Sequence, residues 1–121
     1  MKPPPSLDFM LRDSFPADVA ARNLIMAAYA YYVLDSPIMD DALYDKLSQR
    51  VADKWPLLME ERKWALGNPE DTRASGSHFK FSTRAVMAVA HKFRELGRPE
   101  PPMPETWSFD ENFGHYVTCV M

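Results

Sequence analysis

Glycine and cysteine are scarce in this chain, and it has no long apolar run. Four glycines in 121 residues form no glycine-rich phosphate-binding loop. The single cysteine, Cys119, excludes an intramolecular disulfide and favours a reducing compartment. No apolar run approaches the length that crosses a bilayer, and the start from Met1 to Pro5 lacks the apolar core of a signal peptide. We therefore expect a cytoplasmic protein.

The charge and the composition narrow the function classes further. A formal net charge of −3, with scattered lysines and arginines, gives no general attraction to a polyanion, so direct nucleic-acid binding is not expected. A hydrophobic content of 46% suffices for the core of one small domain. We expect a single compact domain with short tails.

Helical patterns interrupted by prolines predict an all-α fold. Good helix formers run from Ser14, the expected N-cap, to Leu34. This helix should end at Asp35-Ser36-Pro37, because the residue before a proline avoids the helical region. One apolar face is expected from the four-residue set Val19, Met26, Ala30 and Val33.

A second helix completes a helical hairpin over Ala17 to Trp55. Asp40 or Asp41 is the expected N-cap, and apolar residues then recur at four-residue steps as far as Trp55. The reversal between the two helices is predicted at Asp35 to Asp40.

Two further helices and a polar loop are expected after the hairpin. Their ranges are Leu57 to Leu66 for a short helix, Asn68 to Ser77 for the loop, and Ser82 or Thr83 to Leu96 for the last helix. Gly67 and Gly97 follow the two helices and are suited to terminate them.

Proline-rich ends predict a division into three parts. Residues 1–13 form a proline-rich leader, residues 14–97 the helical domain, and residues 98–121 a connector with an aromatic tail. The tail holds Trp107, Phe109, Phe113 and Tyr116, too many aromatics for a disordered segment. We expect it to pack on the helices or on a second copy of the chain, with a short strand from Tyr116 to Val120.

The run from Tyr31 to Asp45 is the most informative part of the sequence. Two adjacent tyrosines, an aspartate, a proline, a further aspartate and a final Tyr-Asp pair fall at fixed offsets. This order resembles the N-terminal helical domain (Ia) of bacterial NAD-dependent DNA ligases, which holds the nicotinamide mononucleotide half of NAD. The resemblance extends from Asn23 to Leu58 and is faint in Thr72 to Gly76. It implies a ligand-binding set of Tyr31, Tyr32, Asp41, Tyr44 and Asp45.

These residue types suit a flat, positively charged nicotinamide ring. The rings of Tyr31 and Tyr44 can lie face to face as a slot, and stacking on a cation contributes about 0.5 to 2 kcal/mol. Asp41 and Asp45, four residues apart on one helical face, can accept hydrogen bonds from ribose hydroxyls or the carboxamide. A purely structural alternative makes Asp41 a helix cap and the two tyrosines a packed pair.

Two weaker candidate sites involve cations and a metal. Ligases carry either His or Tyr at the position of Tyr32, and a tyrosine offers no imidazolium to a phosphate. The nearest cationic candidates for a phosphate are Arg22, Lys46 and Arg50. His115 and Cys119, four residues apart, can share a metal only if their segment is helical, so a zinc site is not expected.

Catalysis is not expected from this chain by itself. Ligases carry AMP on the lysine of a Lys-x-Asp-Gly motif, and this tetrapeptide is absent here. We expect a non-catalytic protein that binds NAD, nicotinamide mononucleotide or a related ADP-ribose nucleotide. Such a module can act in trans with a ligase core, or sequester a nucleotide signal, as viral anti-defence proteins do. The alternatives are a module that mimics the ligase domain and docks on a ligase or replication protein, and an enzyme acting on NAD.

Overall fold

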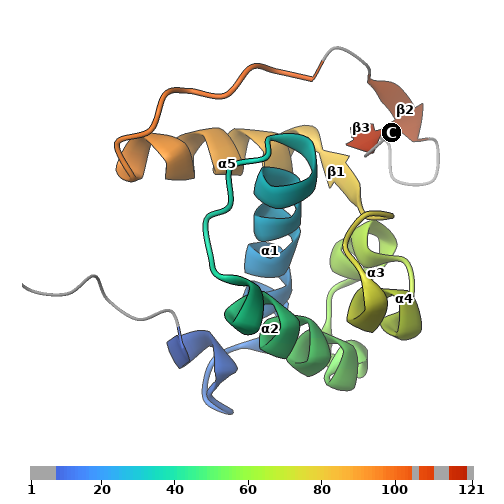
Figure 1. The fold of residues 1–121 in the computed structure, drawn as a ribbon. Coiled ribbons are helices and arrows are strands. Elements are labelled where there is room, and N and C mark those ends of the chain that lie inside the picture. Colours follow the sequence, from blue (N-terminus) through green and yellow to red (C-terminus); the bar gives the residue numbers. More distant parts are fainter. Residues whose placement is uncertain (1–7, 105–106, 111–114, 120–121) are drawn as a thin grey trace, which may run out of the picture.

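The computed structural model describes residues 8–104, 107–110 and 115–119, and it is mainly helical (Figure 1). Helix α1 packs against α2, α3 and α5, while α4 packs on α2. The helices are α1 (Ala17–Ala28), α2 (Asp41–Asp53), α3 (Glu60–Leu66), α4 (Pro69–Ala74) and α5 (Thr83–Glu95). A small antiparallel sheet has the order β1-β3-β2, with β1 (Lys80–Ser82), β2 (Ser108–Asp110) and β3 (His115–Cys119). The predicted all-α class is confirmed, with this sheet as an addition at one side.

Helix α1 ends in a π-helical turn over Tyr29–Val33. The N–H of Leu34 donates to the carbonyl of Tyr29 at 3.2 Å, which spans five residues instead of four. Asp35 then adopts a positive φ of 50°, which is uncommon for a residue other than glycine. The predicted end of the helix is therefore confirmed, but its last turn is wider than expected.

Two details of the predicted first helix are wrong. Pro16, not Ser14, occupies the N-cap position, and no side chain caps this end. The predicted apolar face also fails at its ends, since Val19 is 39% and Val33 37% exposed. Small alanines supply much of the buried face instead, because they allow neighbouring helices to approach closely. The π turn adds a residue and shifts Val33 around the helix.

The start of α2 confirms Asp40 as the N-cap. Its Oδ1 accepts a hydrogen bond from the N–H of Leu43 at 2.7 Å. The predicted reversal between α1 and α2 is an extended link that leads in Figure 1 from the tip of α1 down to α2. Arg98, just beyond α5, donates from Nη1 to the carbonyls of Ser36 at 3.2 Å and Pro37 at 2.8 Å. The link is thus pinned by a residue 61 positions later.

The segment predicted as a polar loop from Asn68 to Ser77 contains helix α4. Asn68 is its N-cap, since Oδ1 accepts from the N–H of Asp71 at 2.8 Å. Pro69 follows in the first turn, where its missing N–H costs nothing. The prediction was wrong because a polar Asn-Pro pair, which is common in loops, also suits the start of a helix.

The last helix begins where the sequence predicts, whereas the short helix α3 begins at Glu60 and not at Leu57, which ends a 3₁₀ turn over Trp55–Leu57. Ser82 caps α5, with Oγ accepting from the N–H of Ala85 at 3.2 Å. Gly67 and Gly97 have φ values of 91° and 71° directly after α3 and the α5 C-cap, as their predicted terminating role requires.

Both ends of the described chain pack on the helices. A 3₁₀ turn at Asp8–Leu11 buries Met10 to 3% exposure, so the last part of the predicted leader belongs to the core. In the tail, Trp107 packs against the core, and the predicted strand is confirmed as β3. Phe113 lies outside the described residues. The three-part division and the contact with a second copy stay predictions.

Among the described residues, no helix combines the length and apolarity that crossing a membrane requires.

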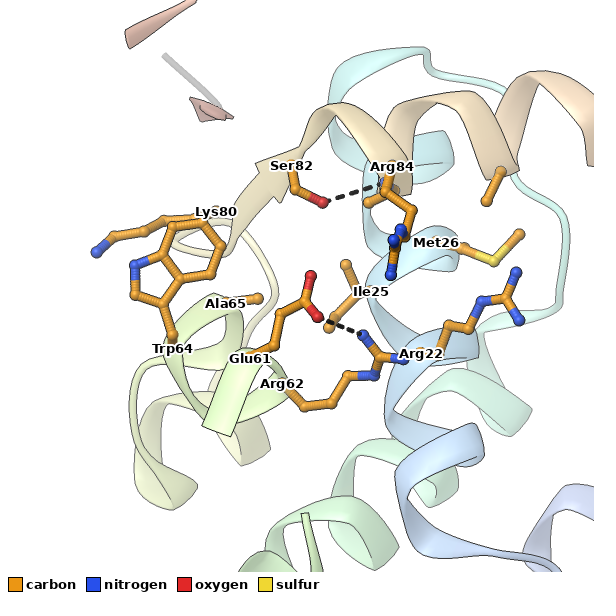
Figure 2. A pocket seen from close by; sticks show the side chains of 12 residues that line it. Arg22, Ile25, Met26, Glu61, Arg62, Trp64, Ala65, Lys80, Ser82 and Arg84 are labelled. Atoms are coloured by element: carbon orange, nitrogen blue, oxygen red, sulfur yellow. Dashed lines mark hydrogen bonds and ion pairs between the residues drawn. The ribbon is translucent and has the colours of Figure 1, made fainter. Parts of the chain in front are cut away.

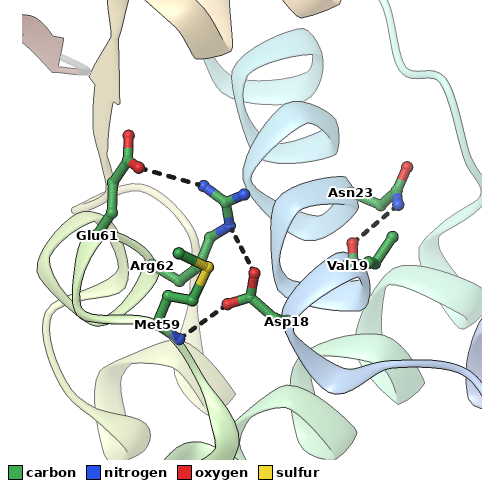
Figure 3. A network of polar contacts seen from close by, with 6 residues as sticks. All are labelled: Asp18, Val19, Asn23, Met59, Glu61 and Arg62. Atoms are coloured by element: carbon green, nitrogen blue, oxygen red, sulfur yellow. Dashed lines mark hydrogen bonds and ion pairs between the residues drawn. The ribbon is translucent and has the colours of Figure 1, made fainter.

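A polar network joins the start of α1 to the start of α3 (Figure 3). The carboxylate of Asp18 accepts from the N–H of Met59 at 2.9 Å and pairs with Nε of Arg62 at 3.5 Å. Arg62 also lies 3.9 Å from the carboxylate of Glu61. Asp18 thereby satisfies an N–H at the beginning of α3 that has no partner within its own helix.

We expect Asp18→Ala to lower the free energy of unfolding by about 1 to 2 kcal/mol, because a helix-end N–H and a guanidinium lose their acceptor. Urea denaturation measures this loss. The matched control is Asp13→Ala, whose fully exposed carboxylate pairs with Arg50 at 3.4 Å and should leave the midpoint unchanged. Equal midpoints for the two variants would contradict a structural role for the network.

Candidate functional site

One cavity of about 240 Å³ lies between the end of α1, the start of α2 and α4. Each binding residue that the motif predicted lines it: Tyr31, Tyr32, Asp41, Tyr44 and Asp45. The remaining wall residues are Ala27, Pro37, Met39, Ser48, Arg73, Ala74 and Ser75. The fold therefore gathers the whole predicted set in one place and adds a third wall from α4.

The π-helical turn carries both adjacent tyrosines into the cavity wall. Their rings meet edge to face, with centroids 4.8 Å apart and planes at 80°. Tyr31 remains 45% exposed, whereas the hydroxyl of Tyr32 is 3.2 Å from Oγ of Ser75 on the opposite wall. Single π turns occur frequently at functional sites, and here the widened turn places two aromatic residues beside each other.

Tyr44 lines the cavity, and its hydroxyl is buried beside Gly76. The buried Oη has no hydrogen-bond partner in the structure, and it lies where a Cβ on Gly76 would stand. Burial raises the pKa of Tyr44 above its ordinary value, and the neighbouring Tyr32 and Asp45 raise it further. The phenol is therefore neutral at physiological pH. Tyr31 and Tyr44 line the same cavity, although the ring pair in contact is Tyr31 with Tyr32.

The two carboxylates of α2 face the same cavity from its first turns. Asp41 and Asp45 both line it and are both exposed. Because Asp40 accepts the capping hydrogen bond, the structural alternative for Asp41 does not hold. Its carboxylate is available to a ligand, and the pair gives this wall a negative charge.

The predicted phosphate contacts are wrong for this cavity. Arg22 lines a different cavity, between α1 and α3. Lys46 and Arg50 line a third, more open depression beside Leu11. The guanidinium of Arg50 is also held by the carbonyl of Phe15, at 3.0 Å. The helical twist explains this result, because residues one and five positions after Asp45 point away from its face.

Arg73 on α4 is the cation that sequence reasoning missed. It lines the cavity, and its Nη2 lies 2.7 Å from Oδ1 of Asp53. Its segment was predicted as a loop, so nothing placed it opposite α2. The only signal was the start of α4 at Asn68-Pro69, which puts Arg73 in the last turn of that helix.

A second, smaller cavity of about 40 Å³ lies between α1, α3 and the start of α5 (Figure 2). Figure 2 shows Glu61 and Arg62 side by side at its rim, joined by an ion pair. Arg62 is further tied to Asp18 at 3.5 Å. A space this small, bordered by a guanidinium that already has two acid partners, is a weaker candidate than the cavity of the motif.

His115 and Cys119 could share a metal only within a helix, and both lie in strand β3. Across the described ranges, no group of three or more His, Cys, Asp or Glu side chains is arranged to hold a metal ion.

A comparison with known protein families matches the segment that contains α1 and α2. Residues 17–54 match the family model described as the DNA ligase-like, N-terminal NAD+-binding domain. The DNA ligase of Salinibacter ruber is 44% identical over 54 residues, which cover 40% of this chain and 8% of that protein. The DNA ligase of Synechococcus sp. (strain CC9902) is 58% identical over 33 residues, or 26% of this chain and 5% of that protein.

A longer similarity includes α4. The DNA ligase of Prochlorococcus marinus (strain MIT 9303) is 30% identical over 99 residues, which cover 80% of this chain and 12% of that protein. The chain thus spans about an eighth or less of the length of these curated relatives. No solved structure matches it.

Proposed function

We propose that this chain binds a nicotinamide nucleotide without turning it over, because residues 17–54 match the family model of the DNA ligase-like, N-terminal NAD+-binding domain. The observation that carries the proposal is the convergence of the predicted tyrosines and aspartates on one cavity. The binding residues are Tyr31, Tyr32, Asp41, Tyr44 and Asp45.

The side chains around the cavity fit the chemistry of an oxidised nicotinamide nucleoside. Aromatic side chains on two walls offer faces to a flat cation, and each such contact contributes about 0.5 to 2 kcal/mol. Asp41 and Asp45 add negative charge and accept hydrogen bonds from ribose hydroxyls or the carboxamide. A neutral or anionic ring would gain less from this wall.

The size of the cavity favours the mononucleotide half of NAD. Sites for small ligands measure about 300 to 1,000 Å³, and this cavity measures about 240 Å³. A nicotinamide ring with its ribose suits this space better than a complete dinucleotide. We therefore rank nicotinamide mononucleotide first, NAD second, and ADP-ribose compounds, which lack the cationic ring, last.

The proposed role is binding, because the 121 residues contain no Lys-x-Asp-Gly motif to carry AMP. A ligase core supplied elsewhere can provide this lysine and use the nucleotide held here. The same binding can instead sequester a nicotinamide nucleotide, for example as a phage anti-defence protein. We propose a cytoplasmic location for either role, on the evidence of the single cysteine.

Calorimetric titration with nicotinamide mononucleotide, NAD, ADP-ribose and cyclic ADP-ribose tests the proposal. We expect the mononucleotide to bind best, and Asp41→Ala or Asp45→Ala to weaken its binding by about 1 to 3 kcal/mol through loss of a charged acceptor. Glu70→Ala, which removes an exposed carboxylate of α4 outside the cavity, is the control and should bind as the wild type does. Unchanged affinity in both aspartate variants would count against the site.

The alternative is an interaction module that docks on a ligase or replication protein. It rests on the same similarity to one ligase domain, which covers 12% of the Prochlorococcus marinus ligase. The titration separates the two functions, because a docking module predicts no heat with any of the four nucleotides. Binding to a purified ligase core, retained in Asp41→Ala, would then support the alternative.

A further inference from the structure

We propose that Arg73 binds the phosphate of the bound nucleotide. In the absence of ligand, the guanidinium of Arg73 pairs with the carboxylate of Asp53, and the phosphate takes the place of this carboxylate when the nucleotide binds. This inference rests on the proposed function and adds the part of the ligand that the motif residues do not explain. It would make the site selective for a nucleotide over the corresponding nucleoside.

The charges around the cavity are segregated between two walls. Asp41 and Asp45 stand on α2, whereas Arg73 and Ser75 stand on or directly after α4. Arg73 is the only cation among the described residues that line the cavity. A zwitterionic ligand therefore has one favourable orientation, with its cationic ring toward α2 and its anionic group toward α4.

Hydroxyl groups extend the α4 wall beside Arg73. Oγ of Ser75 lies 3.2 Å from the hydroxyl of Tyr32 and donates to Oγ of Ser77 at 3.0 Å. The N–H of Ser77 donates back to Ser75 at 3.1 Å. A hydroxyl can rotate its hydrogen toward a new acceptor, so Tyr32 and Ser75 can supplement a guanidinium in binding phosphate oxygens.

The ion pair that now occupies Arg73 is easily exchanged. Its N–O distance is 2.7 Å, but the side chains of Arg73 and Asp53 are 38% and 63% exposed. Pairs so open to water contribute little stability. A phosphate monoester carries about 1.5 to 2 negative charges near neutral pH, more than the single charge of Asp53. It also offers several oxygens to the guanidinium fork, so it competes well with one carboxylate.

Asp53 itself does not line the cavity, which makes the exchange testable. Arg73→Gln and Asp53→Asn break the same ion pair between α2 and α4. If that pair only supports the fold, both variants should have the same effect on the ligand. If Arg73 binds phosphate, only Arg73→Gln should lose affinity for the phosphate-bearing ligand.

The experiment titrates wild type, Arg73→Gln and Asp53→Asn with nicotinamide mononucleotide and with nicotinamide riboside, which lacks the phosphate. We expect the wild type to bind the mononucleotide about tenfold to a hundredfold more tightly than the riboside. Arg73→Gln should lose most of this preference and bind the riboside as the wild type does. Asp53→Asn should keep or increase the affinity for the mononucleotide. Thermal melting of each variant shows whether an affinity change merely follows stability.

Three results would overturn the inference while leaving the proposed function intact. They are equal wild-type affinity for the two ligands, an equal loss for both ligands in Arg73→Gln, and matching losses of mononucleotide affinity in Arg73→Gln and Asp53→Asn. A wild type that binds neither ligand overturns the proposed function and this inference with it.

Discussion

Replacing Gly76 with alanine should lower the free energy of unfolding by about 1 to 3 kcal/mol, the usual cost of inserting a group into a filled core, and should weaken nucleotide binding. A Cβ at this position would overlap the hydroxyl of Tyr44 and stand 3.0 Å from Cβ of Ala28 and 3.2 Å from the ring of Phe79. The Tyr44 ring must then move, and it forms part of the cavity wall. Urea denaturation and calorimetry with nicotinamide mononucleotide measure the two effects.

Two further variants isolate the cause of the Gly76 effect. Gly97→Ala introduces strain at a φ of +71° but meets no atom within 4 Å, so it should lower stability and affect nucleotide affinity less than Gly76→Ala does. Adding Tyr44→Phe to Gly76→Ala removes the overlapping oxygen and should restore part of the lost stability. Wild-type behaviour of Gly76→Ala, or no recovery in the double variant, would show that Gly76 does not position Tyr44.

Tyr44→Ala should have the largest effect on the site itself. Truncating this half-buried ring should lower the free energy of unfolding by about 2 to 4 kcal/mol, because it leaves a cavity in the wall. It should also weaken nucleotide binding by about 1 to 3 kcal/mol through the lost aromatic face. Tyr44→Phe keeps the ring and discards a hydroxyl without a partner, so its stability and affinity should stay close to the wild type. Calorimetry and urea titration of the pair measure the contribution of the ring alone; similar losses in both variants would contradict this account.

The pH dependence of stability provides a second measurement on the same pair of proteins. Burial raises the pKa of Tyr44 in the folded state, so the unfolded chain loses this proton more readily. The neutral Tyr44 makes its full contribution to the free energy of unfolding below about pH 10, the ordinary tyrosine pKa. This contribution is lost as the pH rises toward the folded-state pKa. The wild type should therefore lose more stability in alkali than Tyr44→Phe. The buried Tyr29, whose pKa is also raised, contributes equally to both proteins.

The sequence predicted the parts of the site that depend on local patterns. Asp40 was identified as a possible cap because an aspartate before a helical apolar pattern satisfies a free N–H. The separation of Asp41 and Asp45 by four residues was enough to place both on one face. These features depend on chemistry within a single helix, and periodicity describes that well.

The rest of the site depends on contacts that no local pattern encodes. Arg73 reaches the cavity because α4 packs across α2, which requires both the six-residue helix and its docking. The π turn at Tyr29–Val33 has no clear signature, since the same residues also suit a regular α-helix. The burial of the Tyr44 hydroxyl against Gly76 joins positions 32 residues apart, from Tyr44 to Gly76. In each case tertiary packing selected one of several locally acceptable conformations.

The contacts of Arg98 show that the cavity depends on residues outside the motif from Tyr31 to Asp45. This guanidinium holds the carbonyls of Ser36 and Pro37, inside the link whose Pro37 and Met39 form part of the cavity wall. A peptide limited to residues 17–54 would contain each aromatic ring and carboxylate of the signature, but it would lack this brace and the α4 wall. Transplanting the site onto another scaffold therefore requires the segment from Ala17 through Arg98. This segment is more than twice as long as residues 17–54, which match the family model.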